Sequence, residues 1–295
     1  MEKKKSTEHI SNSEVKYYYD RSIQKISKEI QRIYNSGEYM DLGQEEMYIA
    51  LVMFEKFKIQ FYSAISLANR CTQNPLNQFE YIDIASIQTI IRSCYETFLI
   101  FKYIYLQPEI IGEKEFVELK DDKNKYFESM KLKVLLYQYD GYNQSYYGFS
   151  AVPDEKEKSK KMRDECESKI IKNKLFNSFT DSDQNQILGK WRPSWNRIAL
   201  KTELSEWNSK NMYNIISQYS HNSYTSLMAL NYHYTHLDKF DRDVMFMQLF
   251  EFTAIMINDY VKLFNINHSI FNEDEINLLS EFYGFAQINP KDLIK

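Results

Sequence analysis

Two charged residues lie one helical turn apart in the most apolar helix that the sequence predicts. In RSCYETFLIFKYIY (92–105), Arg92 and Glu96 are surrounded by apolar residues such as Phe98 and Leu99. An exposed pair at this spacing adds only about 0.3–0.5 kcal/mol to helix stability, and cation before acid is the weaker order. Apolar residues on both sides of the pair indicate a central helix, in which buried charges need partners. The pair therefore predicts either a structural network or a functional site.

A second predicted helix offers polar groups that could join this pair. In YNIISQYSHNSY (213–224), Tyr213, Ser217 and His221 recur every four residues and therefore share one helix face. A Ser and a His one turn apart loosely resemble a nucleophile and its base, but the sequence offers no third, orienting residue. A lone histidine on such a face is more often a hydrogen-bonded core residue. The candidate catalytic residues are Arg92, Glu96, Tyr213, Ser217 and His221.

Helices must position these residues, because the composition leaves little room for tight turns. The 295 residues include only 7 Gly and 5 Pro, and no useful length of β alternation occurs. A hydrophobic fraction of 43% is ample for a core. Helical patterns cover 13–35, 44–70, 80–106, 125–139, 155–174, 209–234, 242–265 and 274–283, with a turn and short helix in 189–207 and a loop at 140–155. We therefore predict an all-α fold, with a mobile N-terminal tail at 1–12 and a single helical domain over 13–295.

Charge and cysteine usage narrow the classes of function. A net charge of −4 provides no strong basic field to hold nucleic acid nonspecifically. Cys71, Cys94 and Cys166 are scattered and form no CxxC pair, which fits unpaired thiols in a reducing cytoplasm. The N-terminal basic run has no apolar stretch behind it, so it does not predict a secretory signal. Because the most apolar stretch, 84–106, contains several charges, it indicates a buried helix rather than a membrane span. We expect a cytoplasmic protein with no membrane partner.

Two weaker patterns concern metal and nucleic acid. HYTH places His233 and His236 three residues apart, with Asp238 and Asp241 nearby, but this spacing is common by chance. The tyrosine-rich segment 137–149 could stack unpaired bases, yet no Lys or Arg adjoins it, so we expect a flexible loop over the core. No GxxxxGK[ST], GxGxxG or HExxH motif occurs. We therefore expect neither a cofactor nor a metal.

The chain resembles a widespread bacterial family of helical proteins of unknown function. Three segments, in this order, carry the resemblance: RSCYETFLIFKYI, WRPSWNRIALKTELSEW and MYNIISQYSHNSYTSL. In that family an Arg-x-x-x-Glu helix precedes a Trp-containing segment and a Tyr-x-x-x-Ser-x-x-x-His helix. The resemblance covers about residues 44–236, and the matching residues are Arg92, Glu96, Trp191 or Trp195, Tyr213, Ser217 and His221. The family looks like part of the HEPN superfamily, whose helical bundles often act as ribonucleases in toxin–antitoxin and phage-defence systems.

The resemblance implies a multi-helix bundle with a HEPN-like core and extra helices, an effector acting on RNA, and a homodimer. In such an effector His221 would be the base for the 2′-hydroxyl and Arg92 the cation for the phosphate. The Arg-x(4–6)-His motif that HEPN ribonucleases carry within one helix is absent, and Glu96 would weaken the positive field beside Arg92. The alternative is a non-enzymatic helical module that binds a partner protein or small ligand, with a purely structural polar network.

Overall fold

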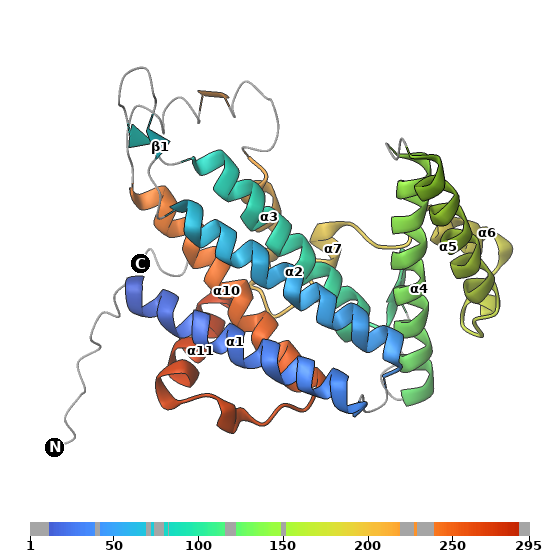
Figure 1. The fold of residues 1–295 in the computed structure, drawn as a ribbon, viewed down its shortest axis with the longest axis horizontal. Coiled ribbons are helices and arrows are strands. Elements are labelled where there is room, and N and C mark those ends of the chain that lie inside the picture. The colour runs from blue at the N-terminus through green and yellow to red at the C-terminus, as the bar shows by residue number, and fades with distance from the viewer. Residues whose placement is uncertain are drawn as a thin grey trace. The chain divides into compact units, whose positions relative to one another are not determined.

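Helices account for nearly all the regular structure in the computed structural model of the chain (Figure 1). The all-α prediction is therefore confirmed. The predicted tail at 1–12 lies outside the described residues, except that Asn12 begins the first helix. Within the described ranges, no helix combines the length and apolarity that crossing a membrane requires. The structure describes residues 12–38, 42–68, 72–73, 80–81, 83–115, 122–148, 152–218, 227–228 and 239–288.

The elements follow the predicted helical patterns closely. The strands are two residues long and form two antiparallel pairs, β1 (Thr72–Gln73) with β2 (Glu80–Tyr81) and β3 (Ile110–Ile111) with β4 (Lys114–Glu115). The helices are α1 (Asn12–Ser36), α2 (Gln44–Ala68), α3 (Ile84–Phe101), the π-helix η1 (Lys102–Leu106), α4 (Lys123–Tyr147), α5 (Pro153–Ile171), η3 (Phe176–Ser178), α6 (Asp181–Gly189), α7 (Trp195–Ala199), α8 (Glu206–Ile216), α10 (Lys239–Leu263), η4 (His268–Ile270) and α11 (Glu273–Ala286).

The chain divides into two compact units. The first comprises residues 1–38, 54–95 and 203–295, and the second comprises 39–53 and 96–202. Helices α2 and α3 each contribute residues to both units. The sequence predicted one domain, and that assignment stays a prediction.

Helices α1, α10 and α11 pack together in the first unit (Figure 1). Tyr19 of α1 is fully buried, its ring stacks on Phe250 of α10 at 4.7 Å, and its hydroxyl donates to the Phe250 carbonyl. Glu275 of α11 is also fully buried and pairs with Arg21 at 3.1 Å and Lys25 at 2.5 Å, both from α1. Since a buried carboxylate is costly without such partners, Glu275 links the charged face of α1 to the start of α11.

One face of α4 holds the end of η1 in the second unit. Tyr126, Ser129 and Lys133 follow one another at helical spacing, and each donates to a main-chain carbonyl. The acceptors are the carbonyl oxygens of Tyr105, Pro108 and, for Lys133, both Tyr103 and Gln107. Carbonyls at a helix end lack partners within the helix, so these side chains supply the missing donors.

Helix α4 is longer than predicted. The loop expected at 140–155 begins only after Tyr147, so most of the tyrosine-rich segment is helical. Asp140 explains part of this extension, because its carboxylate accepts from Gln144 one turn later at 2.8 Å and from the Trp191 indole at 3.2 Å. Two cations of α5 also lie over the Tyr146 ring, Arg163 at 4.7 Å and Lys156 at 5.2 Å. The prediction of a loop is therefore wrong for residues 140–147, and the cations that contact this segment come from a part of the chain that does not adjoin it in sequence.

Helix α8 is shorter than predicted. The expected helix over 209–234 ends at Ile216, and Ser217 caps it by donating its N–H to the Tyr213 carbonyl at 3.0 Å. Asn214, Ile215 and Ile216 are weak helix formers, which fits an end at this point. The prediction of a continuous helix through Ser217 and Gln218 is therefore wrong, whereas His221 lies outside the described residues and its position relative to Ser217 stays a prediction.

Candidate functional site

Arg92 and Tyr213 meet across two helices of the first unit. Arg92 lies in the middle of α3 and Tyr213 near the end of α8, and Nη2 of Arg92 donates to the Tyr213 hydroxyl at 2.7 Å. The guanidinium carbon lies 5.1 Å from the centroid of the Tyr213 ring, within the range of a cation–π contact. Both side chains are half-buried. The structure therefore brings together two of the five predicted residues, 121 positions apart in sequence.

Buried neighbours fix the position of Arg92 on α3. Ile91 and Tyr95 flank it in the sequence and are fully buried, and the Tyr95 ring lies 5.5 Å from that of Phe252 in α10. On the α2 side, Gln60 donates to the Ser93 hydroxyl at 2.5 Å. The backbone that carries Arg92 is thus held by α2 and α10.

The position of Tyr213 depends on how α8 begins. Ser205 caps the helix by accepting from the Asn208 N–H, and its own N–H donates to the Ala286 carbonyl at the end of α11. The Asn208 amide donates to the same carbonyl at 3.3 Å. Met212, beside Tyr213, is fully buried. The C-terminal helix therefore sets the position of the helix that presents Tyr213.

The structure gives less information on the other three predicted catalytic residues. Glu96 is half-buried, lies one turn after Arg92 on α3 and is counted in the second unit. Ser217 is buried, with 5% of its surface exposed, at the end of α8. His221 lies outside the described residues. The roles of these three residues stay predictions.

Trp191 and Trp195, the two tryptophans of the predicted match, lie in the second unit. The Trp191 ring packs against Tyr103 at 5.5 Å and Tyr137 at 5.6 Å. The Arg192 guanidinium carbon lies 3.6 Å from the centroid of the Trp195 ring, and the same side chain donates to the Pro193 carbonyl. Trp191 therefore serves the packing of this unit.

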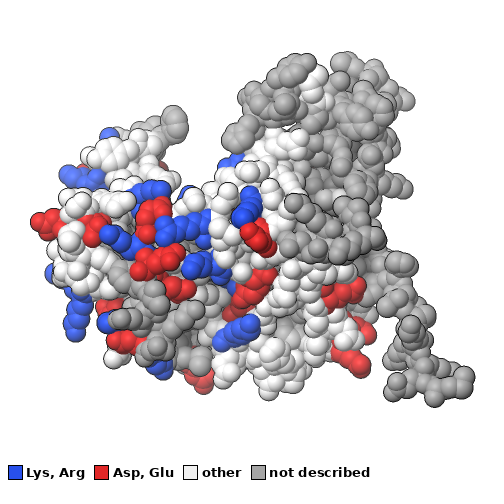
Figure 2. All heavy atoms as spheres, turned by 180° about the vertical axis from the view of Figure 1, so that it is seen from behind, with Lys and Arg blue, Asp and Glu red and all other residues white. Residues whose placement is uncertain are grey.

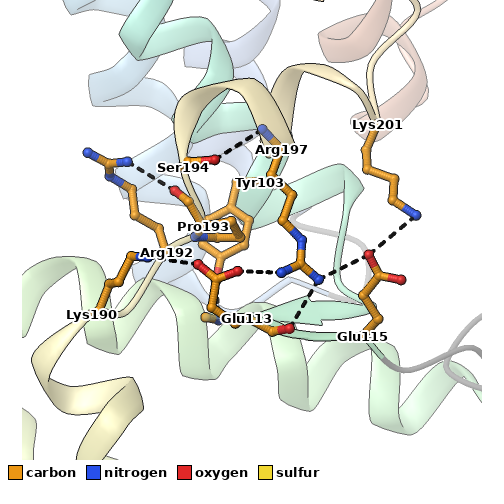
Figure 3. Close-up of polar contacts among 10 residues, drawn as sticks. Tyr103, Glu113, Glu115, Lys190, Arg192, Pro193, Ser194, Arg197 and Lys201 are labelled. Atoms are coloured by element: carbon orange, nitrogen blue, oxygen red, sulfur yellow. Dashed lines mark hydrogen bonds and ion pairs between the residues drawn. The ribbon is translucent and has the colours of Figure 1, made fainter. Parts of the chain in front are cut away.

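A second cluster of charges, which sequence reasoning missed, surrounds Arg197 (Figure 3). Its guanidinium pairs with the Glu113 carboxylate and, at 3.1 Å, with Glu115. Lys190 pairs with Glu113 at 2.8 Å, and Lys201 lies 3.8 Å from Glu115. The hydrogen bond from Lys190, followed by that from Arg197, holds the pKa of Glu113 below its ordinary value.

This cluster stabilises the local fold and is not a candidate functional site. The side chains involved are between 31% and 61% exposed, so each pair contributes at most about 1 kcal/mol. Together with Arg197 bonding to the Glu113 carbonyl, the pairs fasten the β3–β4 hairpin to the segment around α7. Because Glu113 and Arg197 are 84 positions apart, no local spacing in the sequence could reveal the contact.

Lys133 and Glu251 are buried ionisable residues outside both clusters, and burial shifts the pKa of each. Burial lowers the pKa of Lys133 well below its ordinary value, and the amine lies 4.1 Å from the centroid of the Tyr103 ring. On α10, burial raises the pKa of Glu251 to about 7. Neither residue stood out in the sequence, because one Lys or Glu in an amphipathic pattern is ordinarily solvent-exposed.

Metal chemistry has no support in the described part of the chain. No three His, Cys, Asp or Glu side chains gather there as a metal site requires. Of the weak metal pattern, His233, His236 and Asp238 lie outside the described residues.

Comparison with known proteins identifies no relative of this chain. No protein-family model, no curated protein and no solved structure matches the chain. The functional argument therefore starts from the Arg92–Tyr213 contact.

Proposed function

We propose that this chain is a HEPN-like helical effector that acts on RNA, of the kind that serves bacterial phage defence or toxin–antitoxin systems. The observation that supports the proposal is the contact between Arg92 and Tyr213. It places a guanidinium and a phenol together at a half-buried position, where electrostatic interactions are stronger than in bulk water. The chain around His221 follows directly on α8, the helix that carries Tyr213.

These groups match the needs of RNA transesterification. His221 takes the proton of a 2′-hydroxyl, and the 2′-oxygen attacks the adjacent phosphorus. The bond from phosphorus to the 5′-oxygen breaks, and that oxygen takes a proton from a donor such as the Tyr213 hydroxyl. Arg92 stabilises the negative charge that builds up on the non-bridging oxygens. The products are a 2′,3′-cyclic phosphate and a free 5′-hydroxyl, so no metal or external nucleophile is consumed.

The second candidate is a non-enzymatic binding module in which Arg92 and Tyr213 only join two helices. Lys133 favours it, because this same chain buries a basic side chain completely and uses it only to bind main-chain carbonyls. Surface charge favours it too. On the face shown in Figure 2, the described basic and acidic side chains are interspersed, whereas nucleic-acid-binding surfaces usually gather cations.

Expression in bacterial cells separates the two candidates. Wild type, Arg92→Gln and His221→Ala are induced to equal levels, with Arg32→Gln on the exposed part of α1 as the matched control. Growth, phage plating and total RNA integrity are then compared. An RNA effector slows growth or breaks RNA in the wild type and the control, and both active-site variants abolish the effect while keeping their helical content. Intact RNA and unchanged growth, with and without phage, would instead support the binding module.

A further inference from the structure

A cavity of about 330 Å³ lies in the first unit, between α10 and α11. Its volume falls at the small end of the range for ligand pockets, about 300–1,000 Å³. It shares no lining residue with the Arg92–Tyr213 contact. The residues that line it are Ala254, Ile257, Asn258, Val261, Lys262, His268, Phe271, Ile276, Leu279, Ser280 and Tyr283.

The inner wall of this cavity is apolar. Ala254, Ile257 and Val261 are spaced at three and four residues along α10, so they present one row of side chains. Each is at most 3% exposed. Phe271 and Leu279 add apolar surface from the segment before α11 and from α11 itself. Such a wall favours a ligand with a hydrocarbon body, because removing apolar surface from water drives its binding.

The rim carries two nitrogen donors, which a turn brings together. Helix α10 ends just after Lys262, where Asn265 adopts a left-handed backbone with φ of 47° and the Ile266 N–H donates to the Val261 carbonyl at 2.9 Å. This arrangement is the common way for a helix to end and reverse direction. The chain then reaches η4, whose first residue is His268. Both Lys262 and His268 are exposed side chains that line the cavity.

Among the described residues that line the cavity, Lys262 is the one with a permanent charge, although burial and then the nearby carboxylates of Glu203 and Asp259 raise the pKa of Tyr283 in the lining. No residue that lines the cavity is acidic, whereas Lys262 carries a positive charge and His268 offers an N–H donor in either protonation state. Ser280 and Tyr283 of α11 add hydroxyl groups to the lining. A carboxylate complements this set, since it accepts hydrogen bonds from all of these donors and pairs with the ammonium.

We propose that the cavity between α10 and α11 binds a free aliphatic carboxylic acid of medium chain length. The hydrocarbon chain lies along Ala254, Ile257 and Val261, and the carboxylate faces Lys262 and His268. This inference deepens the second candidate function, the binding module, and names its class of ligand. It does not depend on the RNA-directed proposal, because it uses none of the residues assigned to RNA.

Calorimetric titration of the full chain with decanoate, decanol and decyltrimethylammonium, below their aggregation concentrations, tests the charge preference. Decanoate is expected to bind saturably at one site, with decanol weaker and the cation weakest. Replacing Lys262 with Gln should weaken decanoate binding about two- to fivefold, as expected for an exposed ion pair, and leave decanol unchanged. Lys172→Gln, an exposed cation at the end of α5, is the matched control and should bind as the wild type does.

Methyl NMR of the same samples locates the ligand, so a misfolded variant cannot imitate the result. Decanoate should shift the methyl signals of Ile257, Val261 and Leu279 while those of Ile23 in α1 stay in place. Equal affinity for decanoate and decanol, or an unchanged affinity in Lys262→Gln, would overturn the assignment of a carboxylate. Absence of saturable binding, or shifts confined to other methyl groups, would overturn the site itself. RNA integrity in cells reports on the RNA proposal independently of these titrations.

Discussion

Replacing Lys133 with Met tests how a buried amine supports the second unit. The amine donates to the carbonyls of Tyr103 and Gln107 and is fully buried. Methionine keeps the length of the side chain but donates no hydrogen bond, so the Tyr103 carbonyl loses this donor and the Gln107 carbonyl keeps the Ile110 N–H, at 3.2 Å. A buried group left unsatisfied costs about 1–3 kcal/mol, and relief from burying the amine offsets part of this cost. We expect the free energy of unfolding to fall by about 1–3 kcal/mol.

The difference in stability between the wild type and Lys133→Met should increase with pH. Burial lowers the pKa of Lys133 in the folded chain, whereas in the unfolded chain it is near 10.4. Between these two values the unfolded state binds a proton that the folded state lacks, so wild-type stability rises with pH by up to about 1.4 kcal/mol per unit. A neutral amine still has two N–H donors for its two carbonyls. The Met variant lacks this contribution, so its deficit should grow between pH 7 and pH 9.

Urea unfolding followed by circular dichroism at pH 7, 8 and 9 measures both effects. Lys131→Met, on α4 and nearly half exposed, is the matched control and should stay within about 0.5 kcal/mol of the wild type. If Lys133→Met matches the wild type in stability, the carbonyls do not need this donor. If its deficit is large but constant with pH, the lowered pKa is refuted and the amine is charged in the folded chain.

Three further predictions concern the first unit. Glu275→Ala leaves Arg21 and Lys25 without their buried partner and α11 without its capping box. We expect the free energy of unfolding to fall by about 2–4 kcal/mol, with a lower melting temperature, and Glu273→Ala, the control, to be nearly neutral. The Glu251 carboxyl keeps its proton up to about pH 7 when folded but releases it near pH 4.3 when unfolded, so wild-type stability falls as pH rises through that window. Glu251→Gln should therefore be about 3–4 kcal/mol more stable than the wild type at pH 8 and nearly equal to it at pH 4, and a difference independent of pH would refute the raised pKa. In Tyr213→Phe the free energy of unfolding, measured with urea, should fall by about 1–2 kcal/mol. An unchanged urea midpoint would show that the hydrogen bond to Arg92 does not stabilise the fold.

The helices were predictable because their patterns are long and turn formers are scarce. Apolar spacing located α1, α2, α3, α5, α10 and α11 to within a few residues. The two errors have different origins, since α8 ends where the local helix propensity is weak, whereas in α4 contacts distant in sequence outweigh local propensity. Asp140 and Tyr146 find partners on Trp191 and α5, which extends α4 through a segment rich in turn-like residues.

The candidate site was predictable only in part. Two apolar helices bearing polar residues indicated one network of Arg92, Glu96 and His221 that Ser217 or Tyr213 would join, and the structure shows the contact of Arg92 with Tyr213. The Lys133 contacts and the Arg197 cluster join residues at least 26 positions apart without a motif. A single sequence does not encode such pairings in any local spacing. The same holds for the cavity between α10 and α11, whose rim depends on the turn at Asn265.

The most direct test of the RNA-directed proposal is cleavage of a 5′-labelled single-stranded RNA by the purified protein without added metal. The proposal predicts fragments that end in a 2′,3′-cyclic phosphate, formed by the wild type and by Arg32→Gln. Arg92→Gln and His221→Ala, with unchanged circular dichroism, should cleave at least about a hundredfold more slowly, as expected when a phosphate-stabilising cation or a general base is lost. Cleavage that persists in both variants, or RNA left intact by the wild type at micromolar protein, would contradict the proposal.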